Sequence, residues 1–170
     1  MTNHLYLIGG TMGVGKTTVG KILKDNLANS VYLDGDWCWD MHPFSVTEET
    51  KRMVMENIAF LLNNFLRCSA YEHVVFCWVM HEQAIIDELL SRIDTTGCET
   101  YVLSLVCGEE ALKERIERDV ENGLRTPGDL ERSVLRLLLY EKLDSIKIDC
   151  SNKTPPETAE AVLAACGIAQ

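Results

Sequence analysis

Short apolar runs alternate along this chain with longer segments in which apolar positions recur every three or four residues. The apolar runs predict strands at residues 4–8, 31–33, 73–79, 100–106 and 146–149. The longer segments predict helices at residues 16–28, 47–67, 82–93, 109–122, 130–140 and 156–166. Strands that take turns with helices are typical of crossover connections in a parallel sheet. The pattern therefore predicts an α/β fold.

Two local signals refine this order. Thr47, followed by Glu49 and Thr50, puts hydroxyl acceptors and a carboxylate at the first turn of the second helix, which favours a helix start there. Residues 122–129, N-G-L-R-T-P-G-D, interrupt what would otherwise be one long charged helix. No linker or repeat divides the sequence. We expect a single domain over residues 1–170, with a mobile lid at about residues 118–130.

Residues 10–17 read G-T-M-G-V-G-K-T and match the P-loop pattern G-x-x-x-x-G-K-[ST]. The motif follows an apolar strand and opens a helix, so backbone N–H groups and the positive end of that helix converge on one anionic site. Lys16 would reach the β- and γ-phosphate oxygens of a nucleoside triphosphate, and the Thr17 hydroxyl would bind Mg²⁺. The expected ligands are ATP and Mg²⁺. The residues expected to contact the nucleotide here are Gly10, Gly13, Val14, Gly15, Lys16, Thr17 and Thr18.

Two carboxylates follow the second predicted strand, which ends Y-L-D-G-D-W. Asp34 and Asp36 therefore lie at the carboxyl edge of the sheet, where open α/β sheets bind ligands. Together with the P-loop, this pattern resembles the P-loop small-molecule kinases, such as gluconate, shikimate, adenylylsulfate and chloramphenicol kinases, and AAA-type P-loop kinase-like ATPases. The resemblance implies a three-layer fold with a five-stranded parallel sheet in the order 2-3-1-4-5. The other interpretation of Asp34 and Asp36 is a solvated turn in which Asp-Gly supplies backbone geometry alone.

The same resemblance implies roles for these acids and for the segment W-C-W-D-M-H-P-F that follows, residues 37–44. Asp34 would lie nearer Mg²⁺, and Asp36 nearer the acceptor hydroxyl as its orienter or general base. In the kinases that it resembles, the segment and the next helix build a partly apolar acceptor pocket. The residues expected to contact the acceptor are Asp34, Asp36, Trp37, Trp39 and His42, with Asp40 and Phe44 beside them. Aromatic packing under a loop is the alternative for each of the aromatic residues.

A Walker B acid is not obvious, because no acidic residue follows the third predicted strand before Glu82. Several small-molecule kinases also lack this acid and use the D-x-D pattern instead. His81 and Glu82 are candidates for the pocket, although a carboxylate at a helix start also has a structural explanation.

Arginines gather in the segment E-A-L-K-E-R-I-E-R-D-V-E-N-G-L-R, which resembles the helix and lid of nucleoside monophosphate kinase-like proteins. Arg115 and Arg118 lie three residues apart on one helix face, and Arg125 follows in the Gly/Pro break. Arginines on a closing lid can neutralise the charge that spreads over a transferred phosphoryl group. The resemblance implies catalytic roles for Arg118 and Arg125 beside Lys16 and Asp36. Arg115 is explained equally well by ion pairs on a solvated helix.

The loop after the last strand, I-D-C-S-N-K-T-P-P-E, resembles the adenine-side loop of shikimate and gluconate kinases. In those families a proline at this turn packs on the base, so the resemblance implies that Pro155 contacts the nucleotide. The alternative is a proline that only starts a helix, as Pro156 could.

Charge and composition narrow the class of partner. Lys and Arg total 16 against 26 for Asp and Glu, a formal charge of −10, and such a field repels polyanions. Nucleic acid is therefore an unexpected substrate, and a membrane is an unexpected partner because no apolar run reaches the ~20 residues that cross a bilayer. Seven cysteines with no C-x-x-C pair favour reduced thiols and a cytoplasmic location. The sequence does not specify the oligomeric state.

These patterns together predict a kinase that transfers the γ-phosphoryl group of ATP to a hydroxyl, or a phosphate, of a small molecule or nucleotide. A regulatory GTPase would carry N-K-x-D, whereas Asn152, Lys153 and Thr154 are followed by Pro155. The remaining alternative is a nucleotide-dependent regulator or degenerate ATPase without an acceptor, because the missing Walker B acid is typical of those proteins too.

Overall fold

Residues 3–168, which the computed structural model describes, form five strands with one or two helices after each of them. The strands are β1 (Asn3–Gly10), β2 (Ser30–Asp34), β3 (His73–Cys77), β4 (Cys98–Val106) and β5 (Ile146–Asp149). The helices are α1 (Lys16–Asn26), α2 (Glu48–Arg67), α3 (Gln83–Arg92), α4 (Glu109–Glu121), α5 (Gly128–Glu141) and α6 (Pro155–Ala165), and η1 (Gly35–Trp39) is a 3₁₀ helix. The predicted α/β order is confirmed.

The strands form one parallel sheet in the order β2-β3-β1-β4-β5, which confirms the predicted order. The central strand is β1, where Leu7 lies between Phe76 of β3 and Val102 of β4. Because all strands run the same way, their carboxyl ends share one edge. The P-loop after β1 and Asp34 at the end of β2 therefore lie on the same edge of the sheet.

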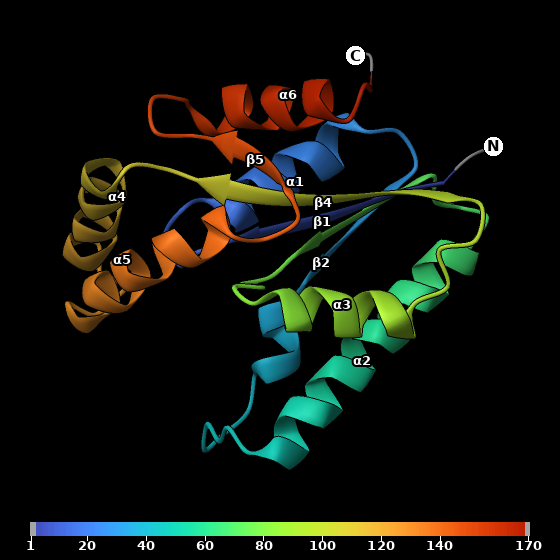
Figure 1. Ribbon diagram of the computed structural model, residues 1–170, viewed down its shortest axis with the longest axis horizontal. Helices are drawn as coiled ribbons and strands as arrows, with labels where there is room; N and C mark the ends of the chain where they lie inside the picture. The colour runs from blue at the N-terminus through green and yellow to red at the C-terminus, as the bar shows by residue number, and fades with distance from the viewer. Residues whose placement is uncertain (1–2, 169–170) are drawn as a thin grey trace.

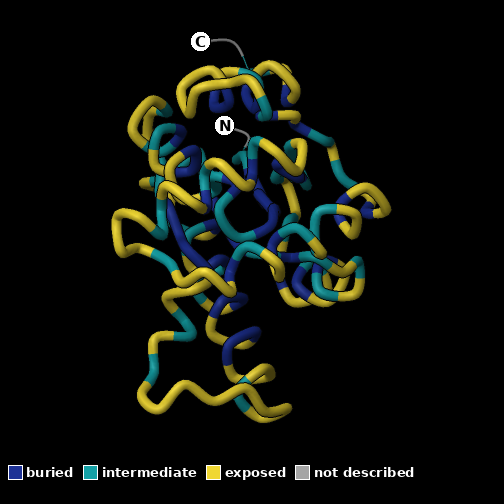
Figure 2. The backbone as a smooth tube through the Cα atoms, turned by 90° about the vertical axis from the view of Figure 1, so that its left-hand side faces the viewer, coloured by how far each residue is buried: buried dark blue, intermediate teal, exposed yellow. Residues whose placement is uncertain are grey.

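Helices cover both faces of this sheet (Figure 1), with α1 and α6 above it and α2 and α3 below it in that view. Side chains of β1 alternate between the two layers: Leu5 and Leu7 pack in a core with α2 and α3, whereas Tyr6 and Ile8 pack in a core with α1 and α6. The buried strands appear as a dark interior between helices with exposed outer faces (Figure 2). Helices α4 and α5 lie side by side at the carboxyl end of the sheet (Figure 1).

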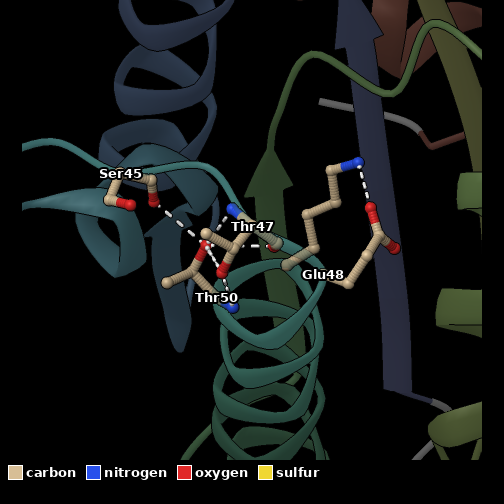
Figure 3. Close-up of polar contacts among 5 residues, drawn as sticks. Ser45, Thr47, Glu48 and Thr50 are labelled. Carbon is tan, nitrogen blue, oxygen red and sulfur yellow. Dashed lines mark hydrogen bonds and ion pairs between the residues drawn. The ribbon is translucent and has the colours of Figure 1, made fainter.

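A reciprocal cap fixes the start of α2, at the residues that the sequence indicates (Figure 3). The Thr50 amide donates to Thr47 Oγ1 at 3.1 Å, and the Thr47 amide donates to Thr50 Oγ1 at 2.8 Å. Each bond satisfies a backbone donor that the helix leaves unpaired, and an N-cap of this kind stabilises a helix by about 1 kcal/mol. The residues before this start, 40–47, form a projecting segment at the lower left of Figure 1, beside the first turns of α2.

One strand is shorter than predicted, because β3 stops at Cys77 and not at residue 79. Trp78 and Val79 lie past the end of the strand and line a cleft, although the Trp78 amide still donates to the Ile8 carbonyl oxygen at 3.1 Å. The segment after Asp34 is also less irregular than expected, because it begins as η1. The break at residues 122–127 between α4 and α5 lies where the Gly/Pro cluster predicts it. Within residues 3–168, none of the helices combines the length and apolarity that a membrane span requires.

Candidate active site

The P-loop leaves the start of α1 open to an anion. Gly15 is the N-cap residue, with a positive φ of 108°, and no side chain caps the helix or places an acid in its first turn. The amides of Lys16, Thr17 and Thr18 begin the helix and have no intrahelical acceptor. A β-carbon added at Gly15 would meet no atom within 4 Å, because this position opens onto the cleft. The loop therefore presents several N–H groups and the positive helix end to one cavity.

Lys16 lies over the loop that precedes it. Its ammonium donates to the Thr11 carbonyl oxygen at 3.0 Å. Burial lowers the pKa of Lys16, whereas the neighbouring Asp36 and Asp34 carboxylates act in the opposite direction. A phosphate beside this ammonium would add a further negative charge and favour its protonated form.

Asp34 is held by donors on both of its oxygens. The Thr17 hydroxyl donates to Asp34 Oδ2 at 3.0 Å, the Tyr32 hydroxyl donates to the same oxygen at 2.9 Å, and the Asp36 amide donates to Oδ1 at 3.0 Å. Asp34 is buried, so these bonds fix its position. A hydroxyl and a carboxylate at this spacing are the hard oxygen donors that Mg²⁺ prefers.

The protein oxygens here fit a Mg²⁺ site that is completed by substrate phosphates. Residues 3–168 contain no group of three or more His, Cys, Asp or Glu side chains that could hold a metal by themselves. Mg²⁺ usually keeps several waters and binds through one or two protein oxygens together with substrate phosphates. The Thr17 and Asp34 pair beside the P-loop matches that mode of binding.

Asp36 and Trp39 share one side of η1, because a 3₁₀ helix has three residues per turn. Both line the cleft. Desolvation raises the pKa of Asp36, and the charge of Asp34 raises it further, while Lys16 and Arg125 act against this shift. Asp36 is itself exposed, at the surface of the cleft, and a raised pKa makes its ionised form a better proton acceptor than a carboxylate with an ordinary pKa.

One cleft of about 1210 Å³ gathers most of the predicted site residues. Those that line it are Gly13, Gly15, Lys16, Thr17, Thr18, Asp34, Asp36, Trp39, Phe44, His81, Glu82, Arg118 and Arg125. Gly10 and Val14 belong to the loop but do not line the cavity, and Val14 is buried. The cleft thus joins the P-loop, both aspartates, Arg118 and Arg125.

Three predicted contact residues lie elsewhere. Trp37, on another side of η1, is 59% exposed and meets the ring of Tyr32 edge-on at 5.7 Å. His42 is exposed in the projecting segment, and Pro155 is the first residue of α6, where a fixed φ favours a helix start. None of the three lines the cleft, so their binding roles stay predictions without support from this placement.

The arginines of α4 and the following break separate into two groups. Arg118 and Arg125 reach the cleft, where Arg125 Nε donates to Asp119 Oδ2 at 2.9 Å. Arg115 also borders the cavity, but its guanidinium donates to the carbonyl oxygens of Val14, at 3.1 Å, and of Cys150. Arg115 therefore fastens α4 to the P-loop, a role that neither sequence interpretation proposed.

Sequence reasoning missed Arg136 of α5, which lines the cleft and has no ion pair among the described residues. Burial lowers the pKa of His81, and the positive charge of Arg136 lowers it further. His81 Nε2 lies 3.3 Å from Glu82 Oε1, and Glu82 makes no side-chain cap at the start of α3. Arg136 follows Arg132 by one helical turn, but Arg132 pairs with Asp129, so spacing could not have distinguished the two.

A family model described as an AAA domain matches residues 7–135, which include the P-loop, both aspartates, Arg118 and Arg125. The chain belongs to this AAA-domain family. A search of curated proteins gives no match. The predicted membership of the P-loop kinase-like proteins is confirmed by this match together with the fold.

Solved structures resemble the AAA-domain protein over nearly its whole length. The tunicamycin resistance protein of Deinococcus radiodurans is 16% identical, covers 99% of this chain and 98% of its own, and has a TM-score of 0.69. A gluconokinase from Sinorhizobium meliloti is 17% identical, the match covers 98% of this chain and 93% of the gluconokinase chain, and the TM-score is 0.71. Shikimate kinase from Acinetobacter baumannii, in complex with shikimate, is 22% identical, the match covers 98% of this chain and 93% of the shikimate kinase chain, and the TM-score is 0.62. At these identities the likeness shows a shared P-loop kinase-like fold.

Proposed function

We propose that this AAA-domain protein is an ATP-dependent phosphotransferase that moves the γ-phosphoryl group to a hydroxyl, or a phosphate, of a small molecule or nucleotide. The observation that carries the proposal is the Thr17–Asp34 pair beside the open start of α1, with Asp36 lining the same cleft. This arrangement supports one place for triphosphate and metal and an adjacent place for an acceptor. Fold alone would not support a function, because this architecture hosts many activities.

Each residue has a distinct task in this proposal. The P-loop amides and Lys16 hold the phosphates, and Thr17 and Asp34 hold Mg²⁺, which neutralises phosphate charge when bound. Asp36 orients the acceptor hydroxyl and accepts its proton, a task for which its raised pKa is suited. Arg118 and Arg125 stabilise the negative charge of the transferred group.

The lid is part of the same proposal. Arg118 lies in α4 and Arg125 in the break before α5, so a movement of that break would bring positive charge toward the phosphates. Closure of such a segment also excludes water, which would otherwise compete with the acceptor hydroxyl. Nucleic acid is disfavoured as an acceptor by the formal charge of −10. The cytoplasmic location expected from the cysteines, which form no disulfide within residues 3–168, stays a prediction.

The experiment is transfer of labelled phosphate from ATP to a panel of hydroxylated acceptors. Asp36→Asn should lower transfer by roughly 10²-fold or more, the usual contribution of a positioned base, with ATP affinity unchanged within a few-fold. The matched control is Asp144→Asn, at an exposed aspartate outside the cleft, which should transfer phosphate like the wild type.

One alternative has an observation in its favour. β3 ends at Cys77, and no acidic residue stands between it and Glu82, as in a degenerate ATPase. A regulator of this kind binds ATP but has no acceptor. If no acceptor raises ATP turnover above the rate in water, the phosphotransferase proposal fails and the regulator is favoured.

A further inference from the structure

An apolar wall lies in the cleft at the side of η1, α2 and α3. It is formed by residues from separate parts of the chain: Trp39, Phe44, Val46, Met55, Trp78 and Ile85. Trp39 and Phe44 are packed on each other, with ring centroids 6.0 Å apart. Phe44 is 67% exposed and Val46 is 53% exposed, although both border a cavity. Exposed apolar side chains that gather at a cleft mark a place where an apolar surface of a ligand can bind.

The segment that carries Phe44 and Val46 projects from the fold and is almost entirely exposed (Figures 1 and 2). Phe44 therefore keeps most of its ring in contact with water when the cleft is empty. Contact with an apolar ligand would remove part of that area from water and favour binding.

Polar groups at the same rim already bond to one another (Figure 3). Thr47 and Thr50 cap α2 reciprocally, and the Thr50 hydroxyl also donates to the Ser45 carbonyl oxygen at 3.0 Å. The Lys51 ammonium lies 2.8 Å from Glu48 Oε1. Unlike the start of α1, the start of α2 thus carries a side-chain cap and two carboxylates, those of Glu48 and Glu49, in its first turn, which disfavour an anion there.

Further along the rim the ionic groups are paired too. Arg52 Nε lies 3.8 Å from Glu56 Oε1, and His81 Nε2 lies 3.3 Å from Glu82 Oε1. A compact polyol or sugar would need several free hydrogen-bonding side chains to hold its hydroxyls. The ionisable side chains that line this side of the cleft besides Asp36 and Arg136 are therefore each in an ion pair, and the remaining lining next to Asp36 is the apolar wall; these side chains are Glu48, Lys51, Arg52, His81, Glu82 and Glu88.

The volume of the cleft also favours an acceptor larger than a compact polyol. The cleft measures about 1210 Å³, whereas a site for one drug-sized ligand has about 300–1,000 Å³. The cavity has room for a nucleotide and for an acceptor with a substantial body. We infer that the acceptor is a hydroxylated compound with a ring-sized apolar body, which packs against the Trp39–Phe44–Val46 wall while its hydroxyl faces Asp36. This inference rests on the proposed function, whose substrate class it names.

The test compares two diols that differ only by a ring, glycerol and 3-phenoxypropane-1,2-diol. Each is titrated calorimetrically into the protein with Mg²⁺ and a non-hydrolysable ATP analogue, and each is then offered as acceptor with ATP. We expect the phenoxy diol to bind at least about tenfold more tightly, because burying a phenyl-sized surface is worth about one to two powers of ten in affinity.

Two variants locate the effect. Phe44→Ala should weaken binding of the phenoxy diol by about tenfold and leave glycerol unchanged. Phe60→Ala is the matched control, because Phe60 is also 67% exposed but lies on α2 outside the cleft, and it should bind both diols like the wild type. Both phenylalanines are exposed, so neither change opens a cavity in the core.

The outcomes separate the two proposals. Selective binding of the phenoxy diol without its phosphorylation supports the apolar site but overturns the claim that this class of compound is the acceptor; the phosphotransferase itself is overturned only if no acceptor of the wider panel raises ATP turnover. Phosphoryl transfer with no preference for the phenoxy diol over glycerol overturns this inference and supports the phosphotransferase. Equal losses in Phe44→Ala and Phe60→Ala, or no measurable binding of either diol, also overturn the inference.

Discussion

Gly13→Ala tests the packing of the P-loop against helix α4. Gly13 has a φ of 83°, in the left-handed region, where a residue with a β-carbon costs roughly 1–2 kcal/mol. A β-carbon at this position would also lie 2.6 Å from Cγ1 of Ile116 on α4. Ile116 is fully buried and cannot swing away, so the added carbon must displace the loop or the helix. Overpacking of this kind costs about 1–3 kcal/mol, which gives a total loss of about 2–5 kcal/mol.

The control for this change is Gly123→Ala. Gly123 has a similar φ of 70°, but an added β-carbon would meet no atom within 4 Å, so we expect a loss of roughly 1–2 kcal/mol from the backbone alone. The free energy of unfolding is measured by urea denaturation, and the excess loss in Gly13→Ala corresponds to about 2–12 °C in Tm. Equal losses in the two variants would refute the claim that the P-loop is wedged against α4.

Three further predictions follow from the site. Arg115→Met should lower the free energy of unfolding by about 2–4 kcal/mol, because the carbonyls of Val14 and Cys150 lose a charged donor. Arg118→Met should change the free energy of unfolding by less than about 0.5 kcal/mol but lower ATP turnover. A reversed pattern in denaturation and turnover assays would contradict this division. Residues 122–129 should exchange amide hydrogens quickly without ligand and slowly with an ATP analogue, and equal exchange in both states would make this stretch an ordinary loop. The free energy of unfolding should fall as the pH drops from about 6.5, because the pKa of His81 is lowered in the folded protein and the unfolded chain therefore binds the proton first. His81→Gln should make this fall shallower in urea denaturation at a series of pH values. The same slope in the wild type and the variant would exclude His81 as its source.

The α/β order and the open loop before α1 could be predicted from strong local signals, whereas the sheet order came from the resemblance to the P-loop kinases. The P-loop match, directly after an apolar run, indicates strand, loop and helix together, and the capping residues Thr47 and Thr50 place the start of α2. Parallel strands then bring Asp34 to Thr17, which hydrogen bond in the structure. The P-loop and the cap need only local sequence, whereas the Asp34–Thr17 contact also needs β2 to lie near β1, which the resemblance implies through the sheet order.

The rest of the site depends on packing that the local sequence does not encode. Trp78 continues the apolar run of β3, and hydrophobicity could not reveal that it lines a cleft and not the sheet. Trp37 and Trp39 look alike in sequence, but the turn of η1 sends only Trp39 into the cavity. Arg115 is held by a contact with Val14, 101 residues away in the sequence. Arg136 reaches the cleft through the packing of α5. Such contacts follow from the tertiary arrangement, which a pattern of residues along one helix cannot supply.

Calorimetric titration of ATP and Mg²⁺ into the wild type and Lys16→Ala tests most directly whether this cleft is a triphosphate site. The account predicts saturable binding to the wild type, and a loss of most of that affinity in the variant, because Lys16 is the P-loop ammonium in the cleft. Thermal unfolding with ATP should follow the same order, since a ligand that binds only the folded state raises its stability. Equal affinity in the wild type and Lys16→Ala would contradict the account, because the nucleotide would then bind somewhere else.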